Sequence, residues 1–144
     1  MKYIIQLLVL MSVSFGAAAN KQIGVGVGFH FGENEIEEQW EDDFRVHGSL
    51  MYNEPGKLYT KIASDFKHYH TASAGISIPV QPFEHGSASI GIGGGVLDYK
   101  YSDDNWVVSL MFASNLVFHN LGQGATIDFN SDMIAFNYFI AFIQ

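Results

Sequence analysis

The chain has 144 residues, a formal net charge of -8 with only seven lysines and arginines, and no cysteine. So little positive charge argues against a nucleic-acid partner, and the lack of cysteine excludes a disulfide framework. Aromatic residues make up 15% of the chain and charged residues only 15%, with 15 glycines. This balance favours a β-rich protein with one face against an apolar medium.

The first 19 residues have the features of a signal peptide. Lys2 gives a short positive start, residues 3–13 are mostly apolar, and residues 17–19 are three alanines that match a small-residue cleavage site. The apolar run is too short for a transmembrane helix, which needs about 20 residues. We therefore expect export, removal of residues 1–19, and a mature domain that comprises residues 20–144.

Large apolar residues alternate with small or polar residues along the mature chain, which is the pattern of β-strands. Turn residues, such as those of segment 53–56 (NEPG), separate most of the alternating segments. The pattern predicts eight strands and no long helix. In chain order, the predicted strands are residues 22–31, 44–52, 58–67, 72–80, 87–96, 106–118, 125–129 and 134–143.

An acidic segment, residues 33–43, separates the first two predicted strands and holds seven carboxylates but no lysine or arginine. On an outer loop such a segment could bind divalent cations, or bridge through them to lipopolysaccharide, because hard cations prefer oxygen ligands. Its candidate metal ligands are Glu37, Glu38 and Asp42. A solvated loop without a bound ion is the simpler interpretation.

The two faces of the predicted strands indicate which side meets an apolar medium. In residues 22–31, valine, isoleucine and phenylalanine share one face, while glycine, glutamine and histidine share the other. A soluble sandwich points large apolar side chains inward and long polar ones outward. Faces of glycine and serine instead suit the crowded interior of a narrow barrel whose apolar residues face lipid, so the sequence predicts an all-β, antiparallel, up-and-down, eight-stranded membrane β-barrel. The residues expected to face lipid include Ile90, Leu110, Phe112, Phe136 and Ile140.

Aromatic and charged side chains can be placed on this barrel. Buried charges must pair, so we expect Arg45, Lys61, Asp65 and Lys67 to form a polar network in the lumen. Such a filled lumen is too narrow for a general pore. Aromatic residues near strand ends fit the girdles of a membrane barrel. These residues are Phe44, Tyr52, Tyr59, Tyr101, Trp106, Phe118, Phe129 and Phe142.

With this pattern, the mature chain resembles the small eight-stranded outer-membrane β-barrels of Gram-negative bacteria. Its last strand, residues 134–144, resembles the C-terminal strand by which such barrels are recognised for insertion, although it ends on Gln144 rather than on an aromatic residue. The resemblance implies a monomer in the outer membrane, with lipid and lipopolysaccharide as partners and without cofactors. It implies a structural, adhesive or surface-interaction role rather than an enzymatic one. A soluble secreted β-sandwich or lipocalin-like binding protein is the alternative.

A stretch from His70 to Glu84 (HTASAGISIPVQPFE) is similar to the motif of the lipid A deacylases, His-x-Ser-Asn-Ala-Gly followed by a distal glutamate. The resemblance implies an outer-membrane esterase, with His70, Ser73 and Glu84 as the candidate catalytic residues. However, Ala72 occupies the serine position, and Ser73 would point to the opposite face of a strand. An eight-strand layout also separates His70 from Glu84, whereas a layout with residues 72–83 as an outer loop joins them but leaves about six strands. We therefore expect no hydrolase activity.

Two other patterns suggest weaker chemistry. His68 and His70 are spaced to share one strand face and could bind a metal, but no third ligand is near them in the sequence. Both also suit a lipid–water boundary as amphipathic side chains. Residues 91–95 (GIGGG) lie within an alternating strand rather than before a helix, so packing inside the barrel explains them better than a phosphate loop.

Overall fold

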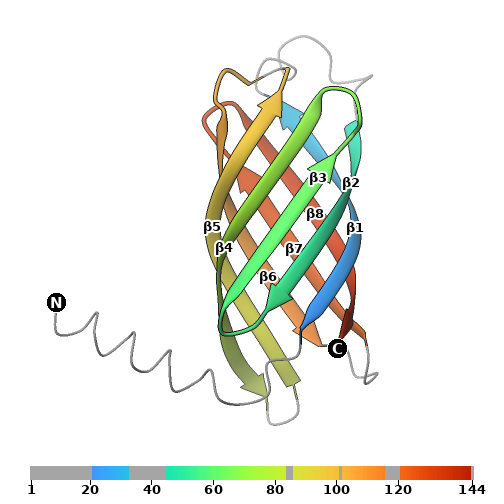
Figure 1. Ribbon diagram of the computed structural model, residues 1–144, viewed down its shortest axis with the longest axis vertical. Helices are drawn as coiled ribbons and strands as arrows, with labels where there is room; N and C mark the ends of the chain where they lie inside the picture. Colours follow the sequence, from blue (N-terminus) through green and yellow to red (C-terminus); the bar gives the residue numbers. More distant parts are fainter. Residues whose placement is uncertain (1–20, 33–44, 84–85, 101, 116–120, 144) are drawn as a thin grey trace, which may run out of the picture.

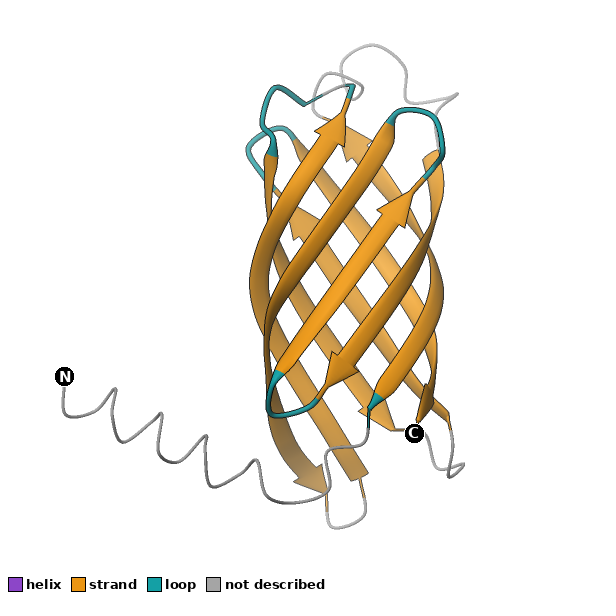
Figure 2. Cartoon of the chain, in the orientation of Figure 1, coloured by secondary structure: helices purple, strands orange, loops and turns teal. Residues whose placement is uncertain are grey.

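The barrel is seen in a computed structural model that describes residues 21–32, 45–83, 86–100, 102–115 and 121–143. Eight strands form one sheet that closes on itself (Figures 1 and 2). Within the described residues, no helix is long and apolar enough to cross a membrane. The strands are β1 (Gln22–Gly32), β2 (Arg45–Glu54), β3 (Leu58–Ser64), β4 (Tyr69–Phe83), β5 (Gly86–Tyr99), β6 (Trp106–Asn115), β7 (Leu121–Phe129) and β8 (Met133–Ile143).

Each strand pairs antiparallel with the next, and β1 pairs with β8 to close the barrel. The closing register matches Gln22 with Ile143 and Gly32 with Met133. Because the sheet is closed, every strand has a hydrogen-bonded neighbour on both sides, as a strand in lipid requires. The predicted eight-stranded up-and-down barrel is confirmed, and the β-sandwich alternative is wrong because the sheet has no open edges.

The connections lie at two ends of the barrel (Figure 1). We call the end that holds the β3–β4, β5–β6 and β7–β8 connections the loop end. The opposite end, where β1 starts and β8 finishes, is the terminal end, and it holds the predicted turn of residues 53–56. There Gly56 has φ of 86° and the Lys57 N–H donates to the Glu54 carbonyl at 2.9 Å, the geometry of a turn that favours glycine.

The β3–β4 loop differs from the predicted strand pattern. Alternation continues to residue 67, yet β3 ends at Ser64 because the side chain of Asp65 folds the chain into a loop. Asp65 Oδ1 accepts the backbone N–H groups of residues 67–69 at 2.8–2.9 Å. As a result, Lys67 is exposed in the loop, and its predicted place in the luminal network is wrong.

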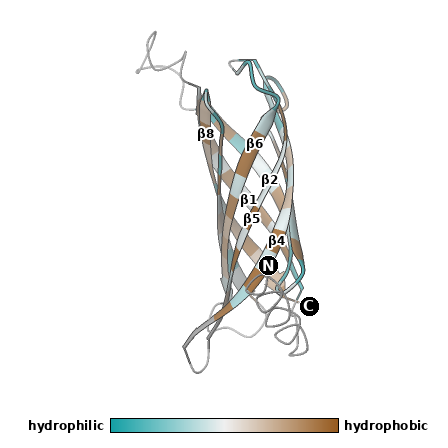
Figure 3. Ribbon diagram, turned by 90° about the vertical axis from the view of Figure 1, so that its left-hand side faces the viewer, coloured by the Kyte–Doolittle hydropathy of each residue, from teal (hydrophilic) through white to brown (hydrophobic). Residues whose placement is uncertain are grey.

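The outer face of the barrel carries the large apolar residues, as predicted. Val27 and Val96 are 64% and 66% exposed, while the residues that alternate with them point into the lumen. Figure 3 shows apolar and polar positions alternating along the strands. The five residues expected to face lipid all lie on this outer face, with Phe136 half-buried because its ring packs 5.3 Å from that of Phe29.

The aromatic girdle is confirmed only in part. Trp106, Phe129 and Phe142 are exposed near strand ends, as expected. Tyr59 is instead fully buried in the lumen, where its hydroxyl donates to the Ser109 carbonyl at 2.9 Å. Phe44, Tyr101 and Phe118 lie outside the described residues, as do residues 1–19 of the expected signal peptide.

The lumen contains larger side chains than the glycine and serine pattern predicts. The ring of Tyr59 uses the space left by Gly75 and Gly91, since a Cβ added at either position would lie 2.6 Å from that ring. Small residues on one wall thus accommodate large residues from another. The other large apolar side chains among the described luminal residues are Met51, Tyr69, Leu97, Tyr99, Met111, Met133 and Phe139.

Candidate functional site

An ion pair crosses the lumen between two opposite walls of the barrel. Lys61 of β3 and Asp128 of β7 are both fully buried and in direct contact. The Lys61 ammonium also donates to Thr126 Oγ1 at 3.4 Å. Alternation predicts that Lys61 points inward, but the predicted network did not include its partner. The pair neutralises two charges that lack contact with water.

Towards the terminal end, a hydrogen-bonded cluster is centred on Asn53. Its amide nitrogen donates to Gln22 Oε1 and to Ser89 Oγ, both at 3.0 Å, and its amide oxygen accepts from Ser77 Oγ at 2.6 Å. These four residues come from β1, β2, β4 and β5, so the cluster ties half of the strands together. Each polar atom of the Asn53 side chain has a partner, as a buried amide requires.

Towards the loop end, two buried histidines form a chain with Asn137. His30 Nδ1 lies 2.8 Å from His47 Nδ1, and His47 Nε2 lies 2.6 Å from Asn137 Oδ1. An amide oxygen only accepts, so His47 Nε2 must carry the proton, and a neutral His47 therefore accepts at Nδ1 from His30. By this argument the proton of neutral His30 is at Nδ1, and its Nε2 has a free lone pair. The His30 ring also stacks on Tyr69 with centroids 4.2 Å apart.

Asp65 connects this histidine pair to the β3–β4 loop. Its Oδ1 holds the loop, while its Oδ2 lies 3.9 Å from His30 Nε2. Partial burial acts to raise the pKa of the Asp65 carboxyl, but the three backbone N–H donors outweigh burial and lower that pKa to about 2. The carboxyl is therefore charged under all ordinary conditions, with Oδ1 bonded to the loop backbone and Oδ2 near His30.

The candidate catalytic residues are not brought together. His70 is exposed on the outer face of β4, whereas Ser73 is buried in the lumen. The layout with residues 72–83 as a loop is wrong, because β4 continues through them. Instead, His70 Nδ1 lies 2.8 Å from Ser64 Oγ, which also accepts the backbone N–H of Phe66 at 2.9 Å. Glu84 lies outside the described residues.

The candidate metal ligands do not form a site within the described residues. His68 lies in the β3–β4 loop and His70 on β4, so the two do not share a strand face as predicted. In the part of the chain that the structure describes, no three histidine, aspartate or glutamate side chains are placed to hold a metal ion. Glu37, Glu38 and Asp42 fall outside that part.

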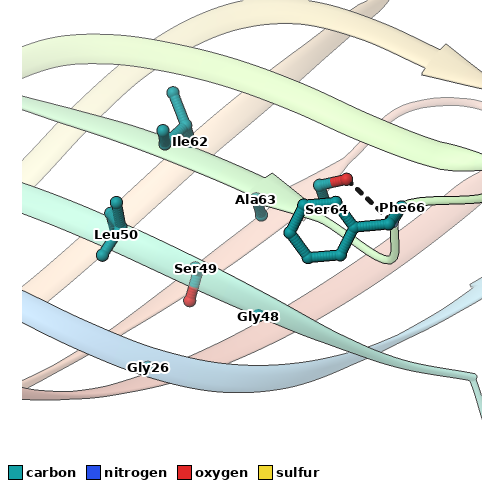
Figure 4. Close-up of a pocket in the computed structure, with 8 residues that line it drawn as sticks. All are labelled: Gly26, Gly48, Ser49, Leu50, Ile62, Ala63, Ser64 and Phe66. Atoms are coloured by element: carbon teal, nitrogen blue, oxygen red, sulfur yellow. Dashed lines mark hydrogen bonds between the residues drawn. The ribbon is translucent and has the colours of Figure 1, made fainter.

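The outer surface has a groove where β2 and β3 meet near the loop end. It has a volume of about 370 Å³, and its outward-facing walls include Leu50, Ile62 and Ser64. Gly48, which is exposed, provides no side chain between these walls. Figure 4 shows Phe66 at the loop-end margin of the groove, with its backbone hydrogen-bonded to Ser64. Sequence alternation places Leu50 and Ile62 on the outer face, but it did not reveal the groove.

Comparisons with known proteins support the fold. No family model and no curated protein matches the sequence. The chain is similar to the solution NMR structure of de novo designed TMB2.3, with a TM-score of 0.53 and 9% sequence identity over 87% of this chain and 94% of that chain. Another similar structure, from "De novo design of transmembrane beta-barrels", has a TM-score of 0.48 and 14% identity over 88% and 96% of the two chains. At 9% identity the first likeness shows the fold alone, which is a closed β-barrel.

Proposed function

We propose that this protein is a small barrel of the Gram-negative outer membrane with a structural, adhesive or surface-interaction role. The observation that carries the proposal is the distribution of residues over a closed sheet. Charged Lys61 and Asp128 lie inside, whereas apolar side chains such as Val27, Ile62 and Val96 lie outside. Soluble monomers rarely expose a contiguous apolar patch of more than a few hundred Å², so lipid is the medium that suits this surface.

The direction of insertion follows from the expected signal peptide and the strand number. An exported chain with an even number of strands has both ends on the periplasmic side. The terminal end would then face the periplasm, and the loop end would face the cell exterior. Outer-leaflet lipid and lipopolysaccharide are accordingly the expected partners, and the barrel is expected to be monomeric.

The contents of the lumen favour a surface role over transport. Tyr59, Phe139 and the Lys61–Asp128 pair occupy its middle, and eight strands leave room for little besides side chains. An esterase role is not proposed. His70 and Ser73 lie on opposite faces of β4, and among the described residues no carboxylate is within ion-pair distance of His70 to orient it.

The experiment that tests membrane insertion is refolding of the mature chain into phospholipid vesicles, followed by a heat-modifiability gel. A closed barrel is expected to migrate differently before and after boiling, and to resist extraction from the vesicles by alkaline buffer. A chain that stays soluble without lipid or detergent, and migrates identically before and after boiling, would contradict the proposal.

A matched pair of substitutions tests which face meets lipid. Leu110 lies near the middle of β6 and Leu58 begins β3, and both are exposed on the outer face. We expect Leu110→Arg to lower the free energy of unfolding in vesicles by about 2–4 kcal/mol, and Leu58→Arg by at most about 1 kcal/mol, because the cost of a charge falls from the bilayer midplane to the interface. Equal effects, measured by urea titration, would contradict this assignment of the surface.

A further inference from the structure

The outer groove between β2 and β3 is open at Gly48, where no side chain fills the surface. The outer face around Gly94, another outward glycine in the described residues, is not open in this way. A Cβ added to Gly48 would meet nothing within 4 Å, whereas one added to Gly94 would lie 3.0 Å from the Val107 carbonyl. Neighbouring Leu50 and Ile62 are 51% and 56% exposed, so they form apolar walls around this opening. The opening therefore suits an apolar chain of small cross-section.

Phe66 extends the apolar wall beyond the end of β3. Its side chain is 88% exposed, and its φ of 62° is uncommon for a residue with a large side chain. The loop holds this conformation through the bonds to Asp65 Oδ1 and through the bond from the Phe66 N–H to Ser64 Oγ. An aromatic ring held at the margin of an apolar groove is placed to cover a lipid chain that enters it (Figure 4).

The polar groups above the groove are arranged to favour an anion. Lys67, His68 and His70 are exposed around the β3–β4 loop. The carboxyl of the same loop, Asp65, is only 12% exposed, and its oxygens face backbone N–H groups and His30. In a chain of net charge -8, the β3–β4 loop thus presents an ammonium group and imidazole groups while its own carboxylate is engaged by the loop backbone. One exposed carboxylate, Asp98 of β5, lies opposite His70 in the strand register.

We propose that this groove and rim bind one molecule of lipopolysaccharide, with an acyl chain over Gly48 and a sugar-bound phosphate at Lys67 and the two histidines. The inference rests on the proposed function, because only an outward-facing loop end meets the lipopolysaccharide leaflet. Three features match the ligand: an apolar groove about 370 Å³ in volume, an aromatic margin, and a donor-rich rim beside it. Phosphate accepts charge-assisted hydrogen bonds from lysine, and imidazole N–H groups can donate to it as well.

The test is a binding titration of the folded, full-length mature barrel in detergent, with fluorescent rough-type lipopolysaccharide as the probe and phosphatidylglycerol as the competing lipid. Lys67→Glu and Gly48→Leu are each expected to weaken lipopolysaccharide binding about tenfold, the first through the phosphate and the second by filling the groove. The matched controls are Lys57→Glu in the turn at the terminal end and Thr60→Leu on the outer face of β3. Both controls are expected to stay within about twofold of wild type.

Each outcome decides between alternatives. Weaker binding by both Lys67→Glu and Gly48→Leu, with both controls unaffected, supports the site. If Lys57→Glu weakens binding equally, the attraction is a general effect of charge and the proposed site is overturned. Wild-type affinity in both Lys67→Glu and Gly48→Leu would also overturn the site. Tighter binding of phosphatidylglycerol would overturn the assignment to lipopolysaccharide. A heat-modifiability gel of every variant shows whether the barrel is folded, so a failure of this site remains distinguishable from a failure of the membrane proposal.

Discussion

The two ends of the lumen hold polar clusters that differ in how completely their atoms are paired. At the terminal end, every polar atom of Asn53 has a hydrogen-bond partner. At the loop end, within the described residues, His30 Nε2, Tyr69 OH and Asn137 Nδ2 are buried without a hydrogen bond. A complete network fixes strand positions, whereas an incomplete one can rearrange at lower cost. The barrel is therefore expected to be rigid near its chain ends and more adaptable near its loops.

The largest expected effect belongs to the ion pair that separates the two clusters. Lys61→Met would leave Asp128 charged and unpaired in the lumen and is expected to destabilise the barrel by about 3–5 kcal/mol. The double variant Lys61→Met/Asp128→Leu removes both charges and should recover most of that loss. Urea unfolding in vesicles measures both, and a single variant as stable as the double would show that the pair is not isolated from water.

The second largest loss of stability is expected for substitutions that compare the two polar clusters directly. Asn53→Leu leaves buried groups of Gln22, Ser77 and Ser89 without partners and is expected to cost about 1–3 kcal/mol. His47→Leu at the loop end should cost less, about 1–2 kcal/mol, because it leaves buried groups of only two residues, His30 and Asn137, without partners. The same urea titration ranks the two. A larger loss for His47→Leu would reverse our view of which end is rigid.

The smallest expected effect is a local loss of stability of the β3–β4 loop at low pH. Because the pKa of Asp65 is lowered to about 2 in the folded protein, its stabilising contribution is present above about pH 4 and is lost as the pH falls from about 4 to 2. The effect should stay local, since the carboxyl is near solvent and its contribution is partly screened. Amide hydrogen exchange is therefore expected to show faster exchange at residues 67–69 over this range, beyond the intrinsic pH dependence of exchange.

The control for this prediction is Asp65→Asn. That variant has no carboxyl to titrate, so exchange at residues 67–69 should show no additional change between pH 4 and 2. If wild type and variant respond to acid in the same way, the hydrogen bonds of Asp65 do not determine the stability of the loop.

Sequence alternation was sufficient to predict the strands and their faces, because a strand exposes every second side chain to the same medium. Alternation puts Tyr59 on the same inward face as Lys61, but it could not show that a ring fits there, since that depends on Gly75 and Gly91 of other strands making room. It also could not pair Lys61 with Asp128, because contact across a lumen depends on the stagger of the whole barrel.

The predicted luminal network of charged residues was only partly correct for a local reason. Alternation treats residues 58–67 as one strand, but the side chain of Asp65 bonds backbone groups that would otherwise continue the ladder. That bond turns Lys67 outward and brings His70 to Ser64. A single side chain that competes with the sheet thus determines which groups reach the rim.

The pairing of β1 with β8 has a consequence for how the barrel forms in time. Every other pair joins strands that are adjacent in the chain, whereas this seam matches Gln22 with Ile143. Contacts between distant residues cost more loop-closure entropy, and proteins rich in such contacts fold slowly. Hairpins between neighbouring strands can therefore assemble early, while the seam has to close after both of its strands exist. Until that step the growing sheet has two open edges, and this is the stage at which the chain is most exposed to pairing with another copy of itself.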